Sequence, residues 1–182
     1  MSQNFKISFS LDEGDIAYFR KLFRSSRKAV EEQDVGEILA AVRELVEKVQ
    51  KAKKTPTFVK ESVAVLEDLK EMLEDAEYEL PRGPRNEILA ALSYFVNPED
   101  LIPDQIPGLG FLDDAIMMKM LEHEFKQELW GYRQFRKFRR GAEQRPWTTV
   151  ARQRLPQRLS DYRKKIRAEV DRKKKERPFS WW

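Results

Sequence analysis

The polar and apolar positions of this chain follow a helical rhythm over most of its length. Apolar side chains recur every three or four residues after Ser10, over residues 37–53, and between Thr55 and a proline-rich stop at residues 81–84. This spacing places them on one face of an α-helix. Ser10 and Glu13 are spaced to form a capping box, and Thr55 is placed to cap the third helix. We therefore predict three amphipathic helices in the first half.

The second half predicts further helices. Residues 85–96 form a compact and strongly apolar helical segment. After a loop rich in proline, glycine and aspartate, a long helix is expected from Asp113 toward Arg140, and a final helix is expected to begin near Pro156. Because amphipathic helices cannot bury their apolar faces alone, they should pack against one another.

The predicted fold is all-α, an irregular bundle of about six helices with a basic C-terminal helical extension. Phe5, Ile7 and Phe9 alternate with polar residues, which suits a short N-terminal strand or an extended arm. We divide the chain into a helical domain, residues 1–140, and a basic helical arm and tail, residues 141–182.

Composition excludes several classes of chemistry. Cysteine is absent and His123 is the single histidine, which removes disulfides, thiol nucleophiles and most His-based metal sites. The N-terminus lacks the features of a secretory signal, and the longest apolar run, residues 88–96, is far shorter than the about 20 residues of a membrane span. We expect a cytoplasmic protein without a transmembrane segment, peripheral at most on the inner face of the membrane.

Charge is distributed unevenly along the chain. Residues 133–182 contain 18 Lys and Arg against 5 Asp and Glu, a balance of +13, and the rest contains 17 basic and 26 acidic residues, a balance of −9. An acidic body with a basic C-terminal region, residues 133–182 and called the arm from here on, predicts an anionic partner, either a membrane surface or a nucleic acid, with an acidic protein as a further option. A basic arm that folds back on its own acidic body is an equally physical interpretation.

Two clusters of the arm are the candidate partner-binding residues. Residues 130–140 interleave aromatic and basic side chains, which could stack bases and contact phosphates, although the aromatic spacing favours a buried helix face. The tail combines lysines with terminal tryptophans, a combination typical of membrane interfaces. The candidates are Arg136, Lys137, Arg139, Arg140, Lys173, Lys174, Lys175, Trp181 and Trp182.

The loop at residues 97–114 has two interpretations. Its aspartates can cap turns and helix starts, with Asp113 capping a helix that begins at Asp114. Alternatively, Asp100, Asp104, Asp113 and Asp114 converge on a hard cation such as Mg²⁺ or Ca²⁺, although their spacing is not that of an EF-hand. Capping is the interpretation we favour, with no cofactor.

The same loop carries a family resemblance. Its fixed positions include Pro98, Pro103, Pro107 and Gly110 together with the four aspartates, and they follow the order P-x-D-L-I-P-D-x-I-P-x-x-G-x-x-D-D. This pattern over about residues 87–121 resembles the signature of the YkvA-like domain, a bacterial family of unknown function. The resemblance implies a helix–loop–helix unit with flanking helices that are often apolar, and it implies no activity.

Together these features predict a non-enzymatic interaction or scaffold module whose basic aromatic arm contacts an anionic partner. The alternative, from a different class, is a divalent-metal-dependent enzyme that uses the aspartates of the loop.

Overall fold

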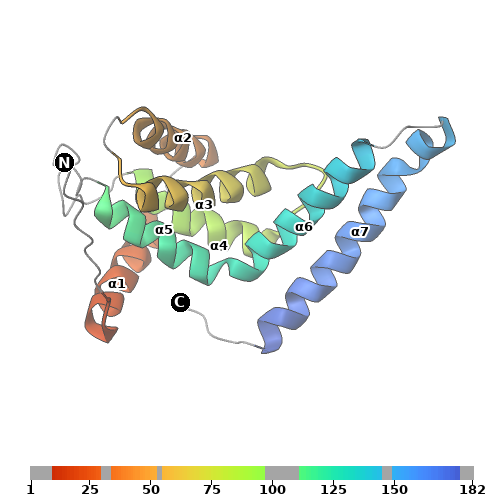
Figure 1. The fold of residues 1–182 in the computed structure, drawn as a ribbon. Coiled ribbons are helices and arrows are strands. Elements are labelled where there is room, and N and C mark those ends of the chain that lie inside the picture. Colours follow the sequence, from red (N-terminus) through yellow and green to blue (C-terminus); the bar gives the residue numbers. More distant parts are fainter. Residues whose placement is uncertain (1–9, 30–33, 53–54, 97–110, 145–148, 177–182) are drawn as a thin grey trace.

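The computed structural model describes residues 10–29, 34–52, 55–96, 111–144 and 149–176, and these ranges are helical almost throughout (Figure 1). The elements in this part of the chain are α1 (Glu13–Ala29), α2 (Val35–Lys51), α3 (Thr57–Glu74), α4 (Arg82–Leu92), the 3-10 helix η1 (Ser93–Val96), α5 (Leu112–Glu124), α6 (Lys126–Glu143) and α7 (Thr149–Glu176). The predicted all-α fold is confirmed. The predicted N-terminal strand or arm lies outside the described residues.

The core is centred on α3, which packs against α2, α5 and α6. The apolar face predicted for α2 is buried as expected, with Ile38, Val42 and Val49 fully inaccessible. Leu66 and Leu69 of α3 are equally buried. The same periodicity that predicted these helices therefore also identified the side chains that hold them together.

The long helix predicted from Asp113 toward Arg140 is instead two helices that meet at Phe125. This residue has φ −94° and ψ 18°, and its ring is 2% exposed. No proline or glycine marks the break, which is why the sequence did not reveal it. The bend keeps Phe125 in the core while α6 leaves the bundle.

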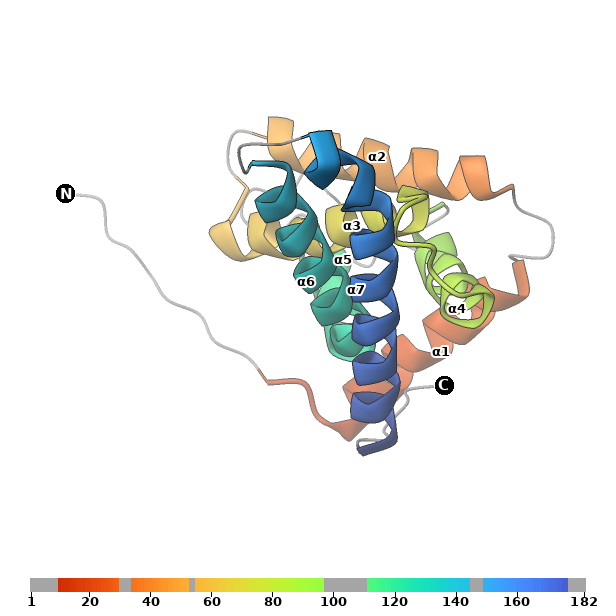
Figure 2. The same ribbon diagram turned by 90° about the vertical axis from the view of Figure 1, so that its right-hand side faces the viewer.

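Helix α7 begins earlier than predicted. It starts at Thr149, and Pro156 lies inside it rather than at its first turn. Leu155 is partly buried against the core, so the extra turns before Pro156 gain apolar contact. Figures 1 and 2 show α6 and α7 side by side, projecting together from one end of the bundle formed by α1–α5.

The predicted caps of α1 and α3 were wrong. The capping box at α1 is formed by Asp12 and Asp15: the Asp12 carboxylate accepts from the N–H groups of Gly14 and Asp15, and the Asp15 carboxylate accepts from the N–H of Asp12 at 3.0 Å. Thr55 does not cap α3. Its hydroxyl donates to the carbonyls of Val49 and Ala52 at the end of α2.

Candidate functional site on helices α6 and α7

The side of α6 that faces α3 is held by arginine–carboxylate pairs. Arg133 Nε lies 2.6 Å from Asp68 Oδ2, and Arg136 Nη2 lies 2.9 Å from Asp68 Oδ1. One turn further, Arg139 contacts Asp75 and Glu77, each at 2.8 Å. The arginines stand three residues apart, so all of them follow one face of α6 along the acidic end of α3.

Asp75 shows the electrostatic effect of this pairing. Burial alone would raise the pKa of its carboxyl, but hydrogen bonding to Arg139 and the Arg139 charge outweigh burial, with help from the N–H groups of Tyr78 and Glu77, and the pKa lies below its ordinary value. The carboxylate also accepts a hydrogen bond from the Tyr132 hydroxyl at 3.2 Å. Asp75 is therefore held in its charged form within the fold.

Helix α7 is fastened to α6 through the buried carboxylate of Glu128. This side chain is completely inaccessible and accepts two hydrogen bonds from Arg167, at 2.8 and 2.9 Å. Lys174 Nζ lies 2.7 Å from the same carboxylate. A buried carboxylate is tolerated because it is paired and hydrogen-bonded on both oxygens. Arg163 adds a pair to Glu79 at 2.7 Å.

Several of the predicted partner-binding residues are already engaged in contacts within the fold. Arg136, Arg139 and Lys174 are engaged by carboxylates of the body, and Lys173 Nζ lies 4.7 Å from the centre of the Trp130 ring. At these positions the arm folds back on the acidic body, the alternative that the charge balance left open. Trp181 and Trp182 lie outside the described residues.

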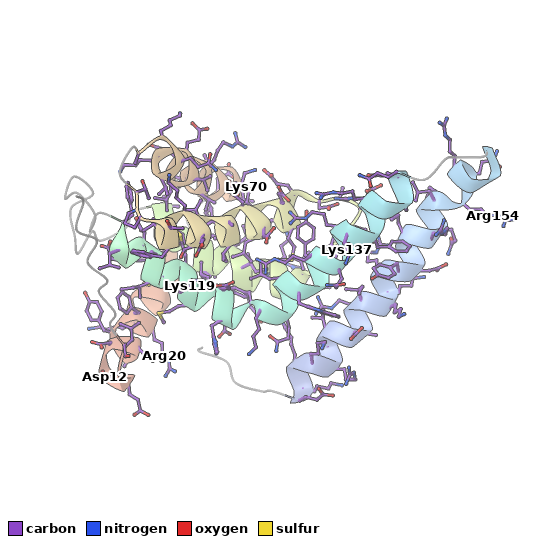
Figure 3. All side chains as sticks on the ribbon, in the orientation of Figure 1. Asp12, Arg20, Lys70, Lys119, Lys137 and Arg154 are labelled. Atoms are coloured by element: carbon purple, nitrogen blue, oxygen red, sulfur yellow. The ribbon has the colours of Figure 1, made fainter. Side chains whose placement is uncertain are left out.

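A second set of cations faces solvent. Figure 3 shows two of them, Lys137 on α6 and Arg154 near the N-terminal end of α7. They are exposed and form no ion pair with any residue in the described ranges. The set consists of Lys137, Arg140, Arg152, Arg154, Arg158, Lys164, Lys165 and Lys175. Lys137, Arg140 and Lys175 are the predicted residues that the structure leaves available to a partner. Sequence reasoning did not single out the others.

Tyr132 and Phe135 of α6 point into the fold, whereas Trp130 and Phe138 are partly exposed. Tyr132 is 2% exposed and Phe135 is fully buried, as the favoured interpretation of their spacing predicted. Phe138 stacks on Tyr162 of α7, with ring centres 4.0 Å apart and planes 10° apart. These rings therefore serve packing between helices rather than forming an exposed platform.

The predicted aspartate cluster is described only in part. Asp113 and Asp114 are buried in the first turn of α5, and the Asp113 carboxylate accepts from the N–H of Asp114 at 3.1 Å. The helix begins at Leu112 and its N-cap is Phe111, which has φ 66°, so Asp113 as N-cap was wrong. A first-turn carboxylate still faces the positive end of the helix dipole.

The remaining motif residues, Asp100, Asp104, Pro98, Pro103, Pro107 and Gly110, lie outside the described residues. Within the described ranges, no three or more His, Asp or Glu side chains are grouped to hold a metal ion.

The central part of the chain is similar to known proteins. Residues 87–119 match the model of a family described as "Protein of unknown function (DUF1232)". A stretch of 49 residues is 45% identical to the "Uncharacterized membrane protein YkvA" of Bacillus subtilis (strain 168), covering 27% of this chain and 46% of that relative. The chain carries a YkvA-like region of unknown function.

The chain spans less than half the length of that relative, and no solved structure matches the chain. The matched residues 87–119 include residues 87–92 of α4, all of η1 and residues 112–119 of α5, and α6 and α7 lie beyond them. None of the described helices is long and apolar enough to cross a membrane.

Proposed function

We propose that this protein is a non-enzymatic interaction module that binds an anionic membrane surface from the cytoplasmic side. The contact is made by the outer face of α6 and α7 and by the lysine- and tryptophan-containing tail. The observation that carries this proposal is the division of the arm into two faces: one face is neutralised by carboxylates of the body, and the other presents exposed cations without ion pairs in the described ranges.

Three features favour a membrane over a nucleic acid. Single strands are bound by stacking bases on exposed aromatic rings, yet the large exposed apolar side chains among the described residues are Tyr18 and Phe58, which lie on α1 and α3. The chain ends in Phe179, Trp181 and Trp182 after a lysine run, a composition suited to the headgroup region. The Bacillus subtilis relative is also named as a membrane protein.

The cationic face sets the expected strength of binding. Each Lys or Arg near an anionic leaflet contributes about 1 kcal/mol, so removing three of them should weaken binding by about 100-fold at moderate salt. The variant R154Q/K164Q/K165Q removes three exposed charges from α7. These side chains make no ion pair in the described ranges, so the fold should be unaffected.

The test is co-sedimentation of the full chain with vesicles of phosphatidylcholine, with and without phosphatidylserine. A matched control, R43Q/K60Q/R82Q, removes three exposed charges from α2, α3 and α4. Binding should require phosphatidylserine, fall in the α7 variant and persist in the control. Equal losses in both variants, or tight binding of single-stranded RNA without vesicle binding, would overturn the proposal.

A further inference from the structure

A groove lies between α6 and α7 where Phe138 stacks on Tyr162. This open groove has a volume of about 320 Å³ and is lined by Gln134, Lys137, Phe138, Gly141, Arg158 and Tyr162, among others. Its size is at the lower end of the range of small-ligand sites, about 300–1,000 Å³. The groove is contributed by both helices, so it exists only while α7 is docked on α6.

The charge of the groove differs from that of the rest of the α6–α7 contact. Elsewhere along these helices, arginines such as Arg139 and Arg167 meet carboxylates. None of the groove-lining residues is acidic, and Lys137 and Arg158 enter from opposite helices without an ion pair in the described part of the chain. The site therefore offers the hydrogen-bond donors of a guanidinium and an ammonium with no acceptor of opposite charge.

Arg158 packs against the stacked rings of Phe138 and Tyr162. Its guanidinium carbon lies 5.9 Å from the centre of the Phe138 ring, and that ring is itself stacked against Tyr162. A guanidinium over a ring face keeps its planar fork available at the edge. At Gly141 an added Cβ would meet nothing within 4 Å, so this wall of the groove is open space.

We propose that this groove binds a phosphate group. Arg158 supplies a bidentate contact to two phosphate oxygens, Lys137 supplies the second positive charge, and the Gln134 amide donates a further hydrogen bond. A phosphate monoester carries about −1.5 to −2 charge at neutral pH, which matches two cations, whereas a carboxylate would neutralise only one. The apolar ring edges accommodate the organic part of the ligand.

Two sources could supply this phosphate: the headgroup of a phospholipid or a free phosphorylated small molecule. Only the lipid source rests on the proposed membrane function. The probe for phosphate chemistry is glycerol 3-phosphate, titrated into the full chain by calorimetry, with acetate as the carboxylate comparison.

The groove is altered in two ways. K137Q/R158Q removes both charges, and Gly141→Asp adds a carboxylate to the groove wall at a position where a Cβ meets nothing within 4 Å. Each should weaken glycerol 3-phosphate binding by about tenfold or more, because charge-assisted contacts are lost or occupied. R43Q/K60Q removes two exposed charges from α2 and α3, away from the groove lining, and should leave the affinity unchanged. Circular dichroism checks that every variant is folded.

Unchanged binding in both groove variants, equal weakening in R43Q/K60Q, or acetate binding as tight as that of glycerol 3-phosphate would overturn the phosphate site. Vesicles then identify the source. A preference for phosphatidic acid over phosphatidylserine at matched surface charge, abolished by Gly141→Asp, assigns a lipid headgroup. Glycerol 3-phosphate binding without that preference assigns a soluble ligand. Absence of all vesicle binding would refute the membrane function and leave the phosphate result standing.

Discussion

The close approach of α6 and α7 at Gly131 can be tested by adding a single methyl group. A Cβ at this position would lie 2.6 Å from Val170 Cγ2, 3.1 Å from the Tyr78 hydroxyl and 3.3 Å from Ile166 Cγ2. Val170 is fully buried and Ile166 is 3% exposed, so neither side chain can move aside into solvent. Overpacking a site of this kind costs about 1–3 kcal/mol.

The same helix contains a matched control. At Gly141 an added Cβ meets nothing within 4 Å. Both glycines lie inside α6, so replacing either by alanine gains about 1 kcal/mol of helix propensity. The difference in unfolding free energy between Gly131→Ala and Gly141→Ala therefore isolates the steric cost, and we expect it to be about 1–3 kcal/mol.

Thermal unfolding followed by circular dichroism measures this difference. For a chain of this size each kcal/mol corresponds to about 2–4 °C, so Gly131→Ala should melt at least about 2 °C below Gly141→Ala. Adding Val170→Ala to Gly131→Ala should give a favourable coupling energy, because the shortened side chain vacates the clashing position. If Gly131→Ala is as stable as Gly141→Ala, then α7 does not pack against α6 as described.

Three further predictions concern charge. Glu128→Gln should destabilise the docking of α7 by about 3–5 kcal/mol, because Arg167 loses the charge of its buried partner. Hydrogen exchange should then show lost protection in α7. Glu169→Gln is a near-neutral control, because the pair of Glu169 with Arg172 is partly exposed to solvent. The pKa of Asp75 is depressed in the folded protein, so the stabilisation by its carboxylate is fully present above the ordinary pKa of 3.8 and is lost as the pH falls through the folded pKa. Asp75→Asn should therefore reduce the loss of unfolding free energy at acidic pH, as measured by denaturation at a series of pH values. Millimolar Mg²⁺, Ca²⁺ or Mn²⁺ should leave the melting temperature unchanged, whereas an aspartate site saturated at 100 times its Kd would add about 2.7 kcal/mol.

The helical pattern was predictable because it is local, and the failures occur where several local options compete. Ser10 with Glu13 and Asp12 with Asp15 have the same three-residue spacing, and the second pair forms the capping box. Thr55 carries a good N-cap side chain, but its hydroxyl donates to two carbonyls at the end of α2 instead. Spacing rules identify such capping candidates but do not say which of them caps the helix, because that depends on where each helix begins and on what lies near its first turn.

The ion pairs of the site were beyond sequence reasoning for a different reason. Glu128 sits on the apolar face of α6 and looks like an exception to the pattern until Arg167 is placed beside it, 39 residues away. The pairs of Arg133 with Asp68 and of Arg139 with Asp75 span 65 and 64 residues. Such contacts depend on how α3, α6 and α7 align with one another, and no periodicity within a single helix contains that information.

This alignment also revises the meaning of the charge split. Six carboxylates of the body, those of Asp68, Glu71, Asp75, Glu77, Glu79 and Glu128, are paired with cations of residues 133–182. Set against the +13 of the arm, they leave an excess of +7. These pairs hold α6 and α7 against the body, and those of Asp68, Asp75 and Glu128 are buried enough to be weakly screened by salt. Only the remaining, exposed excess is available to an external anion. Net charge along a sequence therefore overstates what a partner can contact, and the unpaired cations of the outer face are the residues on which a search for that partner should focus.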